Sequence, residues 1–143
     1  MTGTSIPAAI LAATPPACPA PWRVAIAGAS GRMGRMLLEA VQATDDCVLA
    51  GAVDLASSTE LGQDASAFLG HASGVPITAD LRTGLPGADV LIDFTRPEGT
   101  LAHLHVCAEL GVHAVLGTPG FIEAEQATIA ALAQQTAIVM APN

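Results

Sequence analysis

The sequence contains no lysine and no tyrosine, and only 3% of its 143 residues are aromatic. Its five basic residues are therefore all arginines, set against 13 acidic residues for a net charge of −8. Because a nucleic-acid surface needs a basic patch, five dispersed arginines argue strongly against a nucleic-acid partner. No apolar stretch approaches the roughly 20 residues that cross a bilayer, so no membrane span is expected. Without tyrosine and lysine, the Tyr-x-x-x-Lys pair of short-chain-type enzymes is also excluded.

Cysteine is scarce, and Cys18, Cys47 and Cys107 show no C-x-x-C spacing. An odd number of irregularly spaced cysteines indicates neither a disulfide framework nor a zinc site. We expect small buried or incidental thiols in a reducing compartment, which favours a cytoplasmic protein without a metal.

The chain divides by composition into two parts. Residues 1–21 are uncharged, rich in alanine and proline, and lack the basic start of a secretory signal, so we expect a disordered lead-in. Residues 22–143 are expected to form one domain. With 51% of the whole chain apolar and few aromatics, its core must be built from alanine, valine, leucine and isoleucine.

From Arg23 onward, short apolar runs alternate with segments of helical spacing. Helices are predicted at 32–43, 97–110 and 123–135, and strands at 23–29, 48–53, 74–78, 88–93, 112–116 and 137–140. Strands that lack a polar face and are separated by helices predict a parallel sheet covered on both sides. The fold class expected is therefore α/β, a doubly wound Rossmann sheet. Because the sequence stops just after a strand, a single domain is expected.

Gly28, Gly31 and Gly34 are spaced G-x-x-G-x-x-G between the first predicted strand and the first predicted helix. Gly28 would allow a tight exit from the strand, Gly31 a close approach of backbone to a pyrophosphate, and Gly34 packing of the helix on the sheet. The free N–H groups around Gly31, Arg32 and Met33 are expected to point at the anion, at the positive end of the helix. The turn thus predicts a dinucleotide site.

Asp54 stands about 20 residues beyond Gly34, at the end of the second predicted strand. A carboxylate in this position typically binds the ribose hydroxyls of the cofactor. The following residues, Leu55–Ser58, supply no arginine for a 2′-phosphate, and an ionised Asp54 would repel one. The expected cofactor is a nicotinamide dinucleotide, with NADH bound at least as well as NADPH, although Ser57 and Ser58 could accommodate a phosphate.

The histidines are expected to be solvated or capping residues. His103 and His105 lie two apart on a predicted helix and face different directions, so they cannot jointly hold a metal. His113 opens a strand at the end remote from the ligand, and His71 lies in a loop. Arg35 is expected to flank the pyrophosphate site together with Arg32.

Two more predicted strand ends carry unusual sequence, IDFTRPEGT at 92–100 and GTPGF at 117–121. With VAIAGASGRMGR at 24–35, in this order and spacing, they resemble the amino-terminal half of the bacterial 4-hydroxy-tetrahydrodipicolinate reductase (dihydrodipicolinate reductase) family. The resemblance runs from about residue 23 to residue 143. The string DFTRPEGT is specific to that family, whereas the glycine-rich turn alone is not.

The resemblance implies which residues contact the cofactor. It implies pyrophosphate contacts from Gly28, Gly31, Arg32 and Met33, an adenosine-ribose contact from Asp54, and further cofactor contacts from Phe94, Thr95, Arg96, Gly117 and Thr118. Gly34 completes the predicted cofactor-binding set, and no catalytic residue is predicted in this chain.

The family's reaction is hydride transfer from NAD(P)H to 4-hydroxy-tetrahydrodipicolinate in diaminopimelate and lysine biosynthesis. Two departures bear on it. The family usually reads G-T-T-G-F, whereas Pro119 here offers neither hydroxyl nor N–H to a substrate. The family's catalytic His and Lys segment belongs to a second domain, so this chain alone is expected to be inactive. The resemblance implies a homotetramer for the full-length protein and leaves a monomer open for this chain.

The sequence also allows a second function, a non-catalytic sensor domain. Non-catalytic regulatory domains that sense NAD or CoA also use a glycine-rich turn. A reading frame that continues past Asn143 into a segment with histidine and lysine would favour the reductase, and a natural stop codon there would favour the sensor.

Overall fold

The computed structural model describes residues 20–117 and 120–140, which form a parallel sheet flanked by helices. The strands are β1 (Trp22–Ala27), β2 (Cys47–Val53), β3 (Ile77–Thr78), β4 (Val90–Asp93), β5 (His113–Leu116) and β6 (Ile138–Met140). The helices are α2 (Arg32–Gln42), α3 (Leu81–Gly84), α4 (Pro97–Leu110), α5 (Glu123–Leu132) and the short 3₁₀ turn η1 (Ala67–Leu69). The strand order β3-β2-β1-β4-β5-β6 reverses direction beside β1, which confirms the predicted doubly wound Rossmann sheet.

The element boundaries agree with the sequence patterns to within two residues, apart from three larger differences. The strand expected at 74–78 is reduced to Ile77–Thr78, because Gly74 has a φ of +81° and Pro76 has no N–H for the ladder. Helix α5 ends at Leu132 instead of residue 135. The short elements η1 and α3 were not predicted. Helix α4 begins with proline in its first turn as expected, and ends before Gly111 at a φ of +73°.

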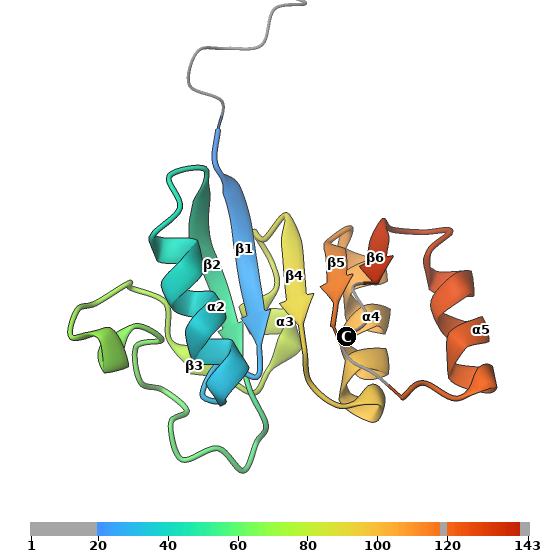
Figure 1. The fold of residues 1–143 in the computed structure, drawn as a ribbon, viewed down its shortest axis with the longest axis horizontal. Coiled ribbons are helices and arrows are strands. Elements are labelled where there is room, and N and C mark those ends of the chain that lie inside the picture. The colour runs from blue at the N-terminus through green and yellow to red at the C-terminus, as the bar shows by residue number, and fades with distance from the viewer. Residues whose placement is uncertain (1–19, 118–119, 141–143) are drawn as a thin grey trace, which may run out of the picture.

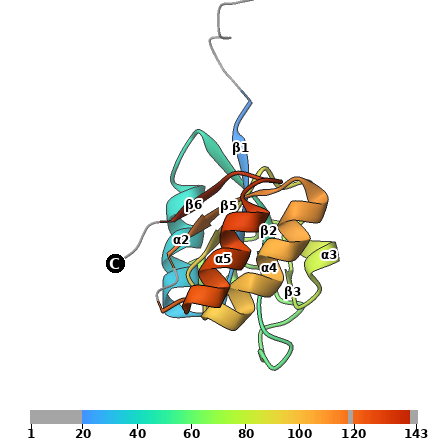
Figure 2. The ribbon, with the colours of Figure 1, turned by 90° about the vertical axis from the view of Figure 1, so that its right-hand side faces the viewer.

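The core lies on both faces of β1. Val24 and Ile26 pack on the side of α2, where Leu38 and Val41 are buried. Ala25 belongs to the cluster on the opposite side, which includes side chains from α4. Figures 1 and 2 show the same division, with α2 on one face of the sheet and α3, α4 and α5 on the other. Burial on both faces explains why β1 has no polar side.

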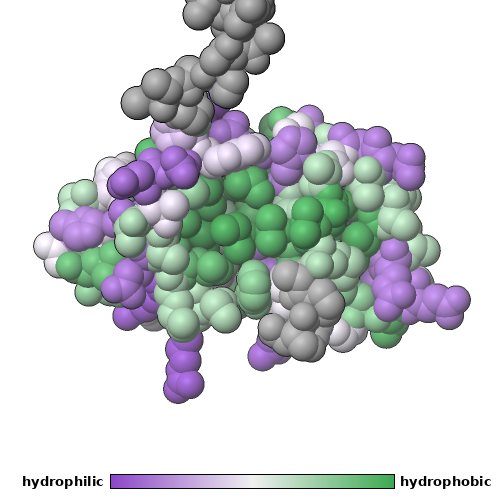
Figure 3. Space-filling model, turned by 45° about the horizontal axis from the view of Figure 1, so that its top comes forward, coloured by the Kyte–Doolittle hydropathy of each residue, from purple (hydrophilic) through white to green (hydrophobic). Residues whose placement is uncertain are grey.

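Coverage of the sheet is uneven. On the α2 side, no helix of the described residues lies over β5 and β6 (Figures 1 and 2). Val115 of β5 pairs with Val139 of β6, which is 58% exposed. Figure 3 shows apolar side chains in a band across this side of the molecule.

None of the helices in the described ranges is long and apolar enough to cross a membrane.

Candidate functional site

The glycine-rich turn connects β1 to α2 at the carboxyl end of the sheet. Gly28 adopts a φ of +72°, and a Cβ there would lie 3.0 Å from Cγ2 of Thr95. Both the backbone conformation and the available space therefore require glycine. The N–H groups of Gly28 and Ala29 donate to the carbonyl of Val53 at 2.9 and 3.1 Å, which ties the turn to the end of β2.

The other two glycines of the motif differ in what they do. A Cβ at Gly34 would lie 1.9 Å from the carbonyl oxygen of Gly28, so the first turn of α2 packs directly on the glycine-rich turn. A Cβ at Gly31 would meet nothing nearer than the same oxygen, at 3.4 Å. The fold thus needs Gly34, whereas the space beside Gly31 would accept a Cβ.

The donors at the start of α2 are fewer than the sequence suggested. The N–H of Gly31 donates to the carbonyl of Gly28 at 3.0 Å, so its assignment as a free donor was wrong. Arg32 and Met33 lie in the first turn of α2, where no intrahelical acceptor exists. Their N–H groups lie at the positive end of the helix, an arrangement that can bind an anion.

Asp54 is bound to the glycine-rich turn through Ser30. One carboxylate oxygen of Asp54 accepts hydrogen bonds from the backbone N–H of Ser30, at 2.8 Å, and from the Ser30 hydroxyl. The other oxygen accepts from the N–H of Leu55 at 2.8 Å. Sequence reasoning found Asp54 but missed Ser30, because the pairing joins residues 24 positions apart and only the parallel pairing of β1 with β2 brings them together.

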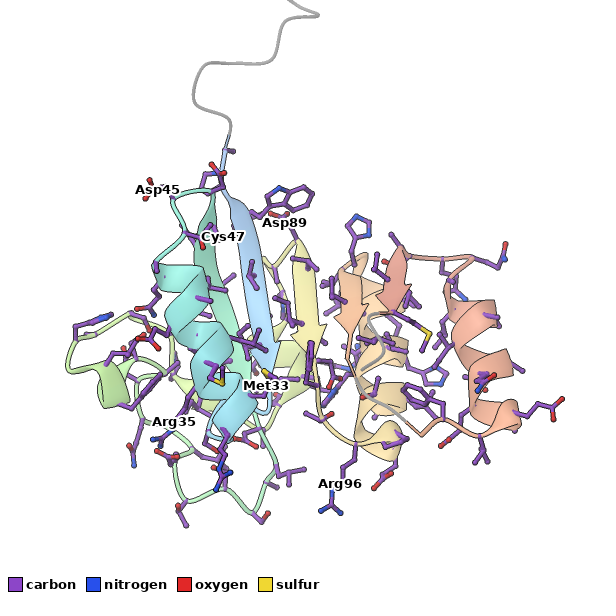
Figure 4. All side chains as sticks on the ribbon, in the orientation of Figure 1. Met33, Arg35, Asp45, Cys47, Asp89 and Arg96 are labelled. Atoms are coloured by element: carbon purple, nitrogen blue, oxygen red, sulfur yellow. The ribbon has the colours of Figure 1, made fainter. Side chains whose placement is uncertain are left out.

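A cleft of about 700 Å³ opens between the turn and the segment after β4, within the size range of small-molecule sites. The predicted residues that line it are Gly28, Gly31, Arg32, Met33, Gly34, Asp54, Phe94, Thr95 and Arg96. Arg96 is exposed, and Figure 4 shows its side chain pointing away from the sheet. Segments from three strand ends therefore meet around one cavity.

Gly117 lies behind this cleft and does not line it. A Cβ at Gly117 would come within 2.1 Å of Cε2 of Phe94, so the Phe94 ring rests on the backbone after β5. The N–H of Gly117 donates to the carbonyl of Asp93 at 2.9 Å. Thr118, also predicted to bind cofactor, and Pro119 lie outside the described residues.

His103 is placed differently from the sequence prediction. It was expected to be solvated or capping, but its side chain is only 17% exposed and lines the cleft. Its Nδ1 lies 2.6 Å from a carboxylate oxygen of Asp93, which is fully buried at the end of β4. The other oxygen of Asp93 accepts from the N–H and the hydroxyl of Thr95 at 2.9 and 2.6 Å. The prediction failed because α4 folds back over the end of β4.

The neighbours of Asp93 favour its ionised form. Burial opposes the negative charge of Asp93, but the hydrogen bond and charge of His103, with the donors of Thr95, outweigh it and lower the pKa of Asp93. The ionised carboxylate accepts a hydrogen bond from the Nδ1–H of His103, which leaves Nε2 as the second hydrogen-bonding atom of the ring. Burial and the charge of Asp93 raise the pKa of Cys107 to about 12, so this thiol stays protonated and is no nucleophile.

The remaining candidate side chains lie elsewhere. His71, His105 and His113 are exposed, as expected. Arg35 does not line the cleft and pairs with Glu60. Within the described ranges, no group of three or more His, Cys, Asp or Glu side chains could hold a metal ion.

Comparisons with known proteins agree with this geometry. Residues 22–143 match the family described as "Dihydrodipicolinate reductase, N-terminus". The chain is similar to the 4-hydroxy-tetrahydrodipicolinate reductase of Herminiimonas arsenicoxydans, with 57% identity over 121 residues, and to that of Cupriavidus pinatubonensis, with 60% identity over 120 residues. These alignments cover 85% and 84% of this chain but only 45% of each relative. The chain therefore spans about half the length of the curated relatives that it matches.

Solved structures show the same fold. A dipicolinate-bound dihydrodipicolinate reductase from Paenisporosarcina sp. TG-14 superposes with a TM-score of 0.67 at 26% identity, covering 86% of this chain and 48% of that one. The WlbA dehydrogenase from Chromobacterium violaceum, in complex with NADH and UDP-GlcNAcA, superposes with a TM-score of 0.68 at 19% identity. That alignment covers 90% of this chain and 37% of the dehydrogenase, and it supports the fold alone.

Proposed function

Because this chain belongs to the dihydrodipicolinate reductase family, we propose that residues 22–143 form the NAD(P)H-binding domain of a 4-hydroxy-tetrahydrodipicolinate reductase. The observation that carries the proposal is the 700 Å³ cleft, in which the glycine-rich turn, Asp54 and the segment DFTRPEGT converge. The family match favours this function over the non-catalytic sensor.

The residues around the cleft fit a dinucleotide. Gly31 has room beside it that the fold does not use, and the N–H groups of Arg32 and Met33 would hold the pyrophosphate. Asp54 would accept hydrogen bonds from the adenosine ribose. Phe94, Thr95, Arg96, Gly117 and Thr118 would bind or support the nicotinamide half. His103, held by Asp93, lies in the same cleft and joins this set.

The proposed reaction of the full-length protein is reduction of 4-hydroxy-tetrahydrodipicolinate to tetrahydrodipicolinate and water, in diaminopimelate and lysine biosynthesis. NAD(P)H supplies the hydride in this reaction. We propose that this chain's own part is to bind and orient the cofactor. We assign no proton donor to the substrate among the described residues around the cleft. We expect no measurable turnover by this chain alone, and a cytoplasmic homotetramer for the full-length protein.

The preference between NADH and NADPH depends on the charge beside the adenosine ribose. The carboxylate of Asp54 would repel a 2′-phosphate, and the exposed residues Leu55 and Ala56 offer no positive charge to offset it. We therefore propose that NADH binds at least as well as NADPH.

Calorimetric titration of the chain with NADH and with NADPH tests the proposal. Asp54→Asn should weaken NADH binding at least about tenfold, because a charged acceptor for the ribose hydroxyls is lost. Asp45→Asn is the matched control, since Asp45 is exposed at the opposite end of the sheet and should leave affinity unchanged (Figure 4). The proposal fails if the wild-type chain binds neither coenzyme, or if Asp54→Asn binds NADH as the wild type does.

A further inference from the structure

A second, smaller cavity lies next to Asp54 on the far side of Ser30. Its volume is about 250 Å³, and Ser30 lines both this cavity and the cleft. The other polar residues lining it are Arg35, Glu60, Gln63 and Asp64. We call it the Arg35 cavity. Ser30, whose N–H and hydroxyl donate to Asp54, therefore contacts both spaces.

Arg35 is held in this cavity by two contacts. Its Nη2 lies 2.9 Å from both carboxylate oxygens of Glu60, and its guanidinium carbon lies 5.1 Å from the centre of the Phe68 ring. Figure 4 shows Arg35 on α2, beside the segment that follows β2. The guanidinium group is thus stacked and ion-paired rather than free in solvent.

Hydrogen bonds connect this ion pair to the predicted ribose carboxylate. The backbone N–H of Glu60 donates to the hydroxyl of Ser58 at 3.2 Å. The Ser58 hydroxyl lies 3.2 Å from the Ser30 hydroxyl, which in turn donates to Asp54. A group attached to a ribose held by Asp54 would therefore face Ser30 and Ser58, with the Arg35 cavity directly behind them.

The charged side chains around the Arg35 cavity disfavour an anion while Glu60 pairs with Arg35. Among its described lining residues, Arg35 alone is positively charged, while Glu60 and Asp64 are acidic. Backbone N–H groups of Ser73 and Ser66 hold the pKa of Asp64 well below its usual value, so this carboxylate is ionised at neutral pH. The arginine that sequence reasoning sought after Asp54 is therefore present, supplied by α2, but Glu60 neutralises it.

We propose that Glu60 determines the coenzyme specificity of this chain by withholding Arg35 from a 2′-phosphate. With Glu60 in place, the site favours NADH. Without its charge, Arg35 stays beside Ser30 through its contact with Phe68 and binds the 2′-phosphate of NADPH. This inference rests on the proposed function, because it presupposes that the ribose lies at Asp54.

The test is titration of NADH and NADPH into the wild-type chain and into Glu60→Gln, Arg35→Gln and the double variant. Glu60→Gln should tighten NADPH binding about tenfold and leave NADH binding within about twofold, since the ion-ion repulsion acts on the phosphate alone. The double variant should lose this gain, because no guanidinium remains to bind the phosphate. Glu109→Gln is the matched control: it removes the same charge from an exposed Arg82–Glu109 pair and should leave both affinities unchanged.

The other outcomes are equally informative. If Glu60→Gln changes NADH and NADPH binding by the same factor, Glu60 only positions its loop and the inference is overturned. An equal gain for NADPH in Glu60→Gln and in the double variant overturns the role of Arg35. An unchanged affinity ratio in Glu60→Gln overturns the inference while the proposed function stands. Failure of the wild-type chain to bind either coenzyme overturns both.

Discussion

The cleft and the Arg35 cavity share Ser30 but are built in different ways. The cleft is shaped mainly by backbone: a positive φ at Gly28, the contact of Gly34 with the turn, and the N-terminus of α2. The Arg35 cavity is shaped by charged side chains, and the members of its ion pair are 41% and 30% exposed. Ion pairs that exposed contribute at most about 1 kcal/mol to stability. The cleft is therefore part of what holds the fold, while the cavity can change specificity at little cost to stability.

The largest effect on stability is expected from a substitution in the backbone contact that shapes the cleft. Gly34→Ala places a methyl group 1.9 Å from the carbonyl oxygen of Gly28, which cannot move without distorting the turn. We expect the free energy of unfolding to fall by about 3 kcal/mol, measured by urea denaturation. Helix propensity alone predicts the opposite sign, a gain of about 1 kcal/mol for alanine over glycine inside α2. A variant as stable as the wild type would show that the turn does not pack on α2 as described.

An intermediate effect on stability is expected from the buried Asp93–His103 pair, and a smaller one from the exposed Glu60–Arg35 pair. Asp93→Asn should lower the free energy of unfolding at pH 7 by about 2 kcal/mol, because a buried charged hydrogen bond is lost, whereas Glu60→Gln should cost less than about 1 kcal/mol.

The pH dependence of Asp93 has a definite sign. Its folded pKa is lower than the model-compound value of 3.8, so its stabilisation is present above that value and is lost as the pH falls through the folded pKa. Urea denaturation at pH 7 and pH 3 should therefore show the gap between wild type and Asp93→Asn narrowing in acid. A gap that is constant or widens would contradict the ionised pair.

The smallest effect on stability is expected from Gly31→Ala, a substitution that should affect ligand binding much more than folding. Gly31→Ala keeps an ordinary backbone conformation, with a φ of −79°, and its methyl group has room in the unliganded fold. The free energy of unfolding should fall by less than about 1 kcal/mol, because alanine replaces glycine only at the N-cap of α2. NADH binding should weaken about tenfold, because the methyl group blocks close approach of the pyrophosphate. Unchanged NADH affinity in the calorimeter would remove Gly31 from the site.

Prediction from sequence located the segments that meet at the cleft and failed for contacts between side chains of distant segments. The three glycines, Asp54 and the segment after β4 were located from their order along the chain, because parallel strands bring their carboxyl ends to one edge of the sheet. Ser30 and His103 were missed. The partner of Ser30 lies 24 residues away and that of His103 lies across the turn from β4 into α4. Neither pairing leaves a periodic signal in the sequence.

The sequence by itself determined the α/β class, the doubly wound parallel sheet and the position of the predicted dinucleotide site, because strand and helix periodicity and glycine conformational freedom act over short segments. Only the tertiary structure decided which polar groups face one another: Asp93 with His103, Ser30 with Asp54, and Glu60 with Arg35. These contacts depend on distances of a few ångströms between segments far apart in the chain. Hydrogen bonds and ion pairs form or fail over such distances, and so they set the chemistry of a site whose location the local sequence already implied.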